Sequence, residues 1–233
     1  MLVEQQSKQE RMHEYYSNRA TALGKYLETR NKTAKVLEKW RELQIRNFLG
    51  LLAQNMEDLE EGHRQKRITK IAWATRNLLE LSIWIEYRSV SVQHAKEIEN
   101  DVARDLMGFA KAVQSALVNT EGAPNPKLEQ SKQNLIKFAE KDLGIPNLDE
   151  QYTRVSEAAK EVGRHQEFAA LNKGLSKYAH PTAVALRSVI THDVDKGLRG
   201  MFFNDGVKLA MDSLMRLERE VLKHFPACHA TKD

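Results

Sequence analysis

The segment from Ile68 to Val92 constrains the fold more than any other part of the chain. It contains neither glycine nor proline, and Ile71, Leu78, Ile85 and Val92 recur every seven residues, while further large apolar side chains occupy its other faces. A helix that is apolar nearly all round is buried on most sides, because its faces would otherwise hold apolar surface in water. We therefore predict that this segment is the central helix of the fold.

The composition favours an all-α protein. Only 11 glycines and 5 prolines occur in 233 residues, too few for the frequent tight turns of an all-β fold. Leu, Ala, Glu, Lys, Arg and Gln dominate, and these residues lose little rotamer freedom in a helix. Apolar residues at helical spacing recur along most of the chain. The pattern predicts a helical bundle of about seven or eight helices.

We expect three parts along the chain: a long N-terminal helix or helical hairpin over residues 1–61, a helical bundle over 62–226 and a polar tail over 227–233. The polar first half of the N-terminal part needs another helix to cover it, from the same chain or from a second subunit. Gly62 is predicted to end this part in the left-handed conformation. The loop 122–125 is the only plausible further division.

Local signals predict several helix ends. Asn125 precedes a proline, which is typical of an N-cap followed by the first helical residue. Gly163 is expected to end a short helix. Gly197 and Gly200 are expected to form a loop before the final helix, Asp205–His224.

Charge and cysteine content exclude few functions. The 36 basic and 32 acidic residues give a net charge of +4, a mild excess that permits nucleic-acid binding without arguing for it. Cys228 is the single cysteine, so an intramolecular disulfide and a cysteine-based zinc site are excluded. No run approaches the ~18 apolar residues of a membrane span, and a secretory signal pattern is absent. We expect a cytoplasmic protein that does not contact a membrane.

Two short segments predict a polar cluster. Arg76 and Glu80 are four residues apart within the segment expected to be buried, where an unpaired charge would be costly. Ser176 and His180 are also four apart, at the end of a later helix, with Tyr178 between them. We expect these five side chains to converge. The cluster is interpreted either as a buried structural network or as a functional site.

The Arg-x-x-x-Glu of the apolar helix and the later Ser-x-Tyr-x-His-Pro resemble an uncharacterised bacterial all-α family, a domain of unknown function that is similar to the HEPN superfamily. The resemblance covers Ile68 to Phe225. Many HEPN proteins are metal-independent RNases of toxin–antitoxin and phage-defence systems, and others are non-catalytic. The resemblance implies that an arginine and a histidine act on a 2′-hydroxyl and a phosphate, at a site composed across a dimer.

The active HEPN motif is an arginine followed by four to six residues and a histidine. Three pairs in this chain match it: Arg88 with His94, Arg187 with His192, and Arg219 with His224. Arg187 and His192 are the best placed, because they closely follow the His-Pro dipeptide and precede a loop. An imidazole can move a proton near neutral pH, and a guanidinium can hold a phosphate. The alternative is that both are incidental surface residues.

The sequence predicts neither a cofactor nor a metal. A glycine-rich phosphate loop, Gly-x-Ser-x-Gly and His-Glu-x-x-His are all absent. His192, Asp193 and Asp195 lie close together in sequence, but an Asp-rich turn explains them better than a metal site.

Three functions remain in competition. The leading hypothesis is a helical interaction module without catalysis, which binds a helical partner or a second copy of itself and belongs to a bacterial defence or toxin–antitoxin-type system. The first alternative is a HEPN-like metal-independent RNase effector. The second is a non-catalytic binder of RNA or DNA.

Overall fold

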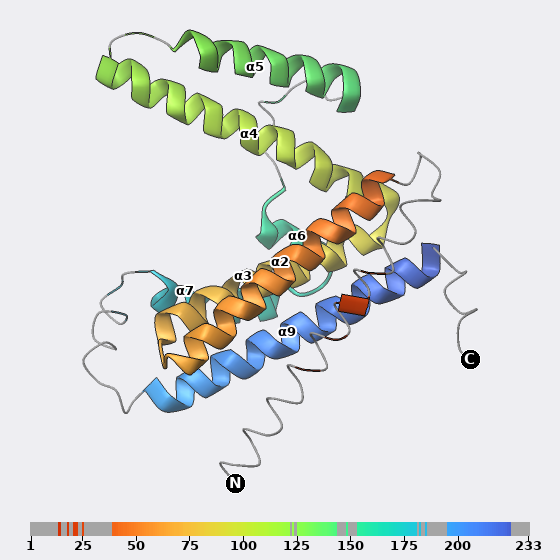
Figure 1. Ribbon diagram of the computed structural model, residues 1–233, viewed down its shortest axis with the longest axis vertical. Helices are drawn as coiled ribbons and strands as arrows, with labels where there is room; N and C mark the ends of the chain where they lie inside the picture. The colour runs from red at the N-terminus through yellow and green to blue at the C-terminus, as the bar shows by residue number, and fades with distance from the viewer. Residues whose placement is uncertain are drawn as a thin grey trace. The chain divides into compact units, whose positions relative to one another are not determined.

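The computed structural model describes residues 39–121, 123, 125–143, 148, 153–180, 182, 185 and 195–224, together with residues 14, 18, 21, 22 and 25. All regular elements in this part of the chain are helical, which confirms the all-α prediction (Figure 1). None of the described helices combines the length and apolarity needed to cross a bilayer. The elements are α2 (Lys39–Arg64), α3 (Ile68–Val90), α4 (Val92–Glu121), α5 (Pro126–Phe138), a π-helical turn (Ala139–Leu143), α6 (Val155–Glu161), α7 (His165–Ala179) and α9 (Asp195–His224).

The chain divides into two compact units. The first, which we call the core unit, comprises Met1–Tyr87 and Ala159–Asp233, and the second, the hairpin unit, comprises Arg88–Ala158. These boundaries differ from those expected from the sequence. The loop 122–125 joins α4 to α5 inside the hairpin unit rather than separating two domains.

Helix α3 supplies the centre of the core unit. Three side chains of its predicted apolar repeat, Ile71, Leu78 and Ile85, have no solvent exposure. The prediction is wrong for the fourth, Val92, because α3 ends at Val90 and Val92 begins α4 with 48% of its side chain exposed. Helices α2 and α9 run alongside each other (Figure 1) and add their own fully buried leucines. The largest of these buried side chains are Leu52 and Leu59 of α2 and Leu214 and Leu217 of α9. The predicted interior role of the Ile68–Val92 segment is therefore confirmed for this face of the helix.

Gly206 lets α9 approach α2 and α3 closely. A Cβ atom built on Gly206 would lie 2.7 Å from a methyl group of Leu59 and 2.9 Å from the hydroxyl oxygen of Thr75. The same hydroxyl group donates a hydrogen bond of 2.9 Å to the carbonyl oxygen of Phe202, which lies one turn before Gly206 in α9. The three helices thus meet where only a glycine fits.

The predicted loop at Gly197 and Gly200 is wrong, because α9 begins at Asp195 and continues through both residues. Each glycine in a helix costs about 1 kcal/mol relative to alanine. Burial of the neighbouring Phe202 and Phe203, which are 4% and 6% exposed, offsets that cost. Tertiary packing therefore outweighs the low helix propensity of these two glycines.

The predicted helix end at Gly62 is also wrong. Helix α2 continues to Arg64, and Lys66 adopts the left-handed conformation with φ of 57°. Gly62 is instead a close-approach residue, since an added Cβ would lie 3.0 Å from the backbone nitrogen of Ile71. Two other predicted ends are confirmed. Asn125 caps α5 by accepting two backbone N–H bonds, and Gly163 follows α6 with φ of +73°.

Two glycines of α9 provide a matched stability test. Gly206→Ala should lower the free energy of unfolding by about 1–3 kcal/mol, because its Cβ overlaps Leu59 and Thr75. Gly200→Ala should instead raise it by about 0.5–1 kcal/mol, because a Cβ there meets nothing within 4 Å. Urea denaturation measures both. Equal effects of the two substitutions would contradict the close packing at Gly206.

Candidate functional site

The guanidinium of Arg76 connects α3 to α7. Its Nη2 lies 3.1 Å from Oε1 of Glu80, and its Nε donates to Oδ1 of Asn172 at 2.9 Å. Its Nη1 lies 3.1 Å from Nε2 of His180. Because arginine nitrogens only donate, His180 Nε2 must accept, so this contact requires an imidazole that is unprotonated at Nε2.

The structure brings together four of the five side chains expected to cluster. Ser176 donates to Oδ1 of Asn172 at 3.3 Å and so reaches Arg76 through that amide. Tyr178 lies apart from this network and packs edge-on against Phe202 of α9, with ring centroids 5.6 Å apart. Asn172 was missed by the sequence analysis. Its position in the sequence could have indicated this role, because Asn172 lies four residues before Ser176 and therefore shares a face of α7 with it.

The expectation that Arg76 and Glu80 are buried needs correction. Their side chains retain 27% and 30% of their solvent exposure. Both lie about half a helical turn from Ile71 and Leu78, on a side of α3 where Trp73 is also 43% exposed. The pair is therefore a half-exposed clamp between two helices, and its guanidinium already uses Nε, Nη1 and Nη2 within the protein.

Arg187 and His192, the predicted nuclease pair, lie outside the described residues, as does Asp193. The structure therefore gives no geometry for them, and their role stays a prediction. Within the part of the chain that the structure describes, no group of three His, Cys, Asp or Glu side chains could hold a metal ion.

A second charged network, missed by the sequence analysis, joins α3, α7 and α9. Glu86 lies between two arginines: Oε1 is 3.0 Å from Arg216 Nη2, and Oε2 is 3.3 Å from Arg164 Nη1. Arg164 also makes a two-pronged pair with Glu167, with N–O distances of 2.7 and 2.9 Å. Glu86 is a charge in the same apolar helix as Arg76 and Glu80, so the cost of an unpaired charge predicted a partner for it as well.

These contacts set the protonation of the network. Burial alone would lower the pKa of Arg164, but its hydrogen bonds and the charges of Glu167 and Glu86 outweigh that effect and raise the pKa. The hydrogen bond from Arg164 lowers the pKa of Glu167. The Arg164–Glu167 pair therefore stays ionised over the physiological pH range, and it serves as an electrostatic link rather than as an acid–base pair.

The hairpin unit carries an exposed apolar face on α4. Val102, Leu106 and Phe109 are 53%, 53% and 71% exposed. Their spacing of four and three residues places them on one side of the helix. We call these three residues the α4 stripe. So large an exposed side chain as Phe109, flanked by two more, is typical of an interaction surface rather than of a solvated helix.

No family model, no curated protein and no solved structure matches this chain. The resemblance to a HEPN-like family therefore stays a prediction.

Two glutamates of α3, Glu80 and Glu86, should contribute different amounts to the free energy of unfolding. Glu86→Gln should lower the free energy of unfolding by about 1–3 kcal/mol, because it removes the counter-charge of Arg216 and one of the two carboxylates that hold Arg164. Glu80→Gln should cost about 1 kcal/mol or less, because that carboxylate is more exposed and has one arginine partner. Urea titrations at neutral pH compare them. A larger loss for Glu80→Gln would contradict the central place of Glu86.

Proposed function

We propose that this protein is a non-enzymatic helical interaction module that pairs with a second copy of itself through the α4 stripe. The observation that carries the proposal is the exposure of Val102, Leu106 and Phe109 on one face of one helix. Covering such side chains stabilises a complex by about 1–2 kcal/mol each. Association of this kind needs no cofactor and no catalytic group.

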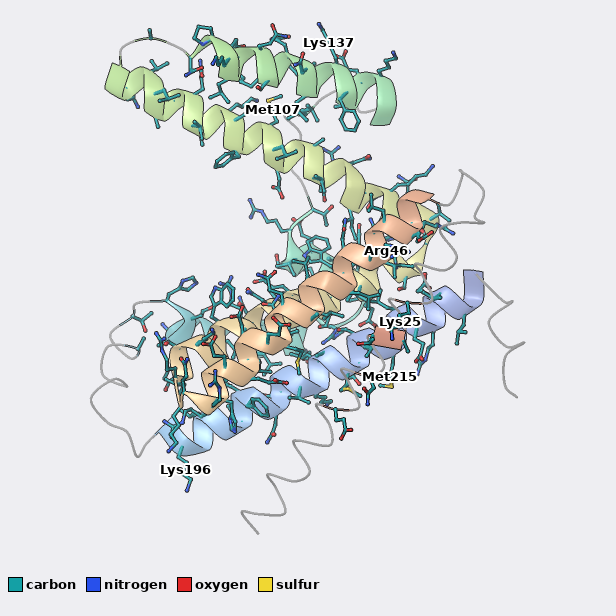
Figure 2. The ribbon with its side chains drawn as sticks, in the orientation of Figure 1. Lys25, Arg46, Met107, Lys137, Lys196 and Met215 are labelled. Atoms are coloured by element: carbon teal, nitrogen blue, oxygen red, sulfur yellow. The ribbon has the colours of Figure 1, made fainter. Side chains whose placement is uncertain are left out.

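The thin core of the hairpin unit supports the proposal. Its buried apolar cluster contains Ala103 and Ala139, with Leu135 and Leu148 packed against them. Met107 lies on the side of α4 that faces α5 (Figure 2), whereas α5 itself has no buried residue among those described. Helices draw most of their stability from tertiary packing. Because the apolar side chains that the described part of this unit buries are small, apart from Met107, a further covering layer would stabilise it.

The shape of α4 favours a second copy as that layer. Ala112 lies three residues beyond Phe109, on the same side of α4, and has a small exposed side chain. In an antiparallel crossing between these positions, Phe109 of each copy lies over Ala112 of the other. The same side of α4 thus carries a large side chain, Phe109, and a small one, Ala112, so each copy can accommodate the other, as a two-fold interface requires. Two hairpins joined in this way make a four-helix bundle.

The RNase alternative depends on Arg187 and His192, which lie outside the described residues, so it stays a prediction. The nucleic-acid-binding alternative rests on the net charge of +4 alone. Membership of a defence or toxin–antitoxin-type system likewise stays a prediction.

Phe109→Glu should weaken self-association by at least about 100-fold, because a charge would be buried at the centre of the interface. Sedimentation velocity over a concentration series measures the change, and circular dichroism checks that helicity is kept. Lys137→Glu is the control, since Lys137 projects from α5 away from α4 (Figure 2) and should leave association unchanged. Association that survives Phe109→Glu would reject the stripe as the interface.

The orientation has its own test. In a Cys228→Ser background, Ala112→Cys should crosslink two copies through a short bismaleimide, because the two sites lie near the two-fold axis. Val102→Cys should not crosslink, because antiparallel pairing separates its two copies by about 25 Å along the helix. Crosslinking at both positions would indicate parallel pairing, and the antiparallel arrangement would then be wrong.

A further inference from the structure

A pocket of about 310 Å³ lies within the core unit, between α3, α7 and α9. It lies beside the charged network that holds Glu86, and Arg164 and Arg216 belong to both the network and the pocket lining. Its volume is at the lower end of the range found for small-molecule sites in proteins, which is roughly 300–1,000 Å³. The pocket is independent of the α4 stripe, which belongs to the other unit.

One wall of the pocket is fixed in place. Arg164 is held by Glu86, by Glu167 and by the hydroxyl oxygen of Ser82, to which it donates at 3.0 Å. Arg216 is tied to Glu86 but remains 40% exposed, so part of its guanidinium stays available to a ligand. Side chains locked by such bonds present a preorganised surface.

The wall that α9 supplies, which includes Arg216, also carries two charged side chains, Lys208 and Asp212, that lack contact partners among the described residues. Asp205, Lys208, Asp212 and Arg216 follow one another at spacings of three, four and four residues, so they share one face of the helix. Charges at such spacing ordinarily pair along a solvated helix. Here Arg216 turns to Glu86 instead. Among the described residues, Lys208 and Asp212 have neither a hydrogen bond nor an ion pair at contact distance.

Asp205 extends the same wall. Burial raises the pKa of its carboxyl group, while the nearby charge of Lys208 acts in the opposite direction and that of Glu167 raises it further.

Negative and positive side chains alternate along α9, and this alternation limits the kind of ligand that the pocket can bind. A simple anion would be attracted by Lys208 and Arg216 but repelled by Asp205 and Asp212, and a simple cation would meet the reverse. A molecule with a positive and a negative group close together satisfies both. We propose that this pocket binds a free α-amino acid, with its ammonium group on Asp212 and its carboxylate on Lys208 and Arg216, which flank Asp212 one turn before and one turn after it.

The test uses the full-length protein and the twenty standard L-amino acids as separate probes, in isothermal titration calorimetry and thermal-shift assays. At least one amino acid should bind saturably with a dissociation constant below about 10 mM. Its N-acetyl derivative and its methyl ester, which each lack one charge, should bind at least about tenfold more weakly. Failure of all twenty, or equal binding of the blocked derivatives, would overturn the proposal.

Substitutions locate the site. Lys208→Gln and Asp212→Asn should each weaken binding at least about tenfold without loss of stability, since neither side chain has a contact partner to lose. Lys196→Gln is the control, because Lys196 lies at the beginning of α9 away from the pocket (Figure 2). If all three variants bind as the wild type does, the amino acid lies elsewhere and this pocket is not its site.

Discussion

Burial of α3 is the constraint on which the rest of the core unit depends. Its repeat of Ile71, Leu78 and Ile85 has no exposure, so other helices must cover that face. The same helix carries charges on its remaining, partly exposed sides, and these charges pair with side chains of the helices packed around it. The Arg76 clamp to α7 and the Glu86 link to α7 and α9 are these pairings. Packing and electrostatics are therefore two consequences of one apolar segment.

Much of this arrangement was predictable from the sequence, and the exceptions share a cause. The interior helix and the convergence of Arg76, Glu80 and His180 followed from periodicity and from the cost of isolated charges. Gly62 and Gly206 were not foreseen as close-approach residues, because a glycine that ends a helix and one that admits a neighbouring helix look alike in a sequence. The partners of Glu86 come from distant segments, which local spacing cannot identify.

The two units differ in how completely they satisfy their own apolar residues. The core unit encloses large leucine and isoleucine side chains, whereas the buried apolar side chains described in the hairpin unit are alanines and Met107. The α4 stripe leaves Phe109 in water on the less well-filled unit. A stable body that carries an incompletely covered hairpin suits a protein that works by association. The amino-acid pocket would give such a protein a means of sensing a small molecule.

The central claim is that the chain completes its hairpin with a second copy. The most direct measurement is the molar mass of the wild-type protein in solution, by light scattering over a micromolar concentration series. We expect a mass of twice the 26.7 kDa of one chain, falling toward the single-chain value on dilution. A mass of one chain at every concentration would contradict it.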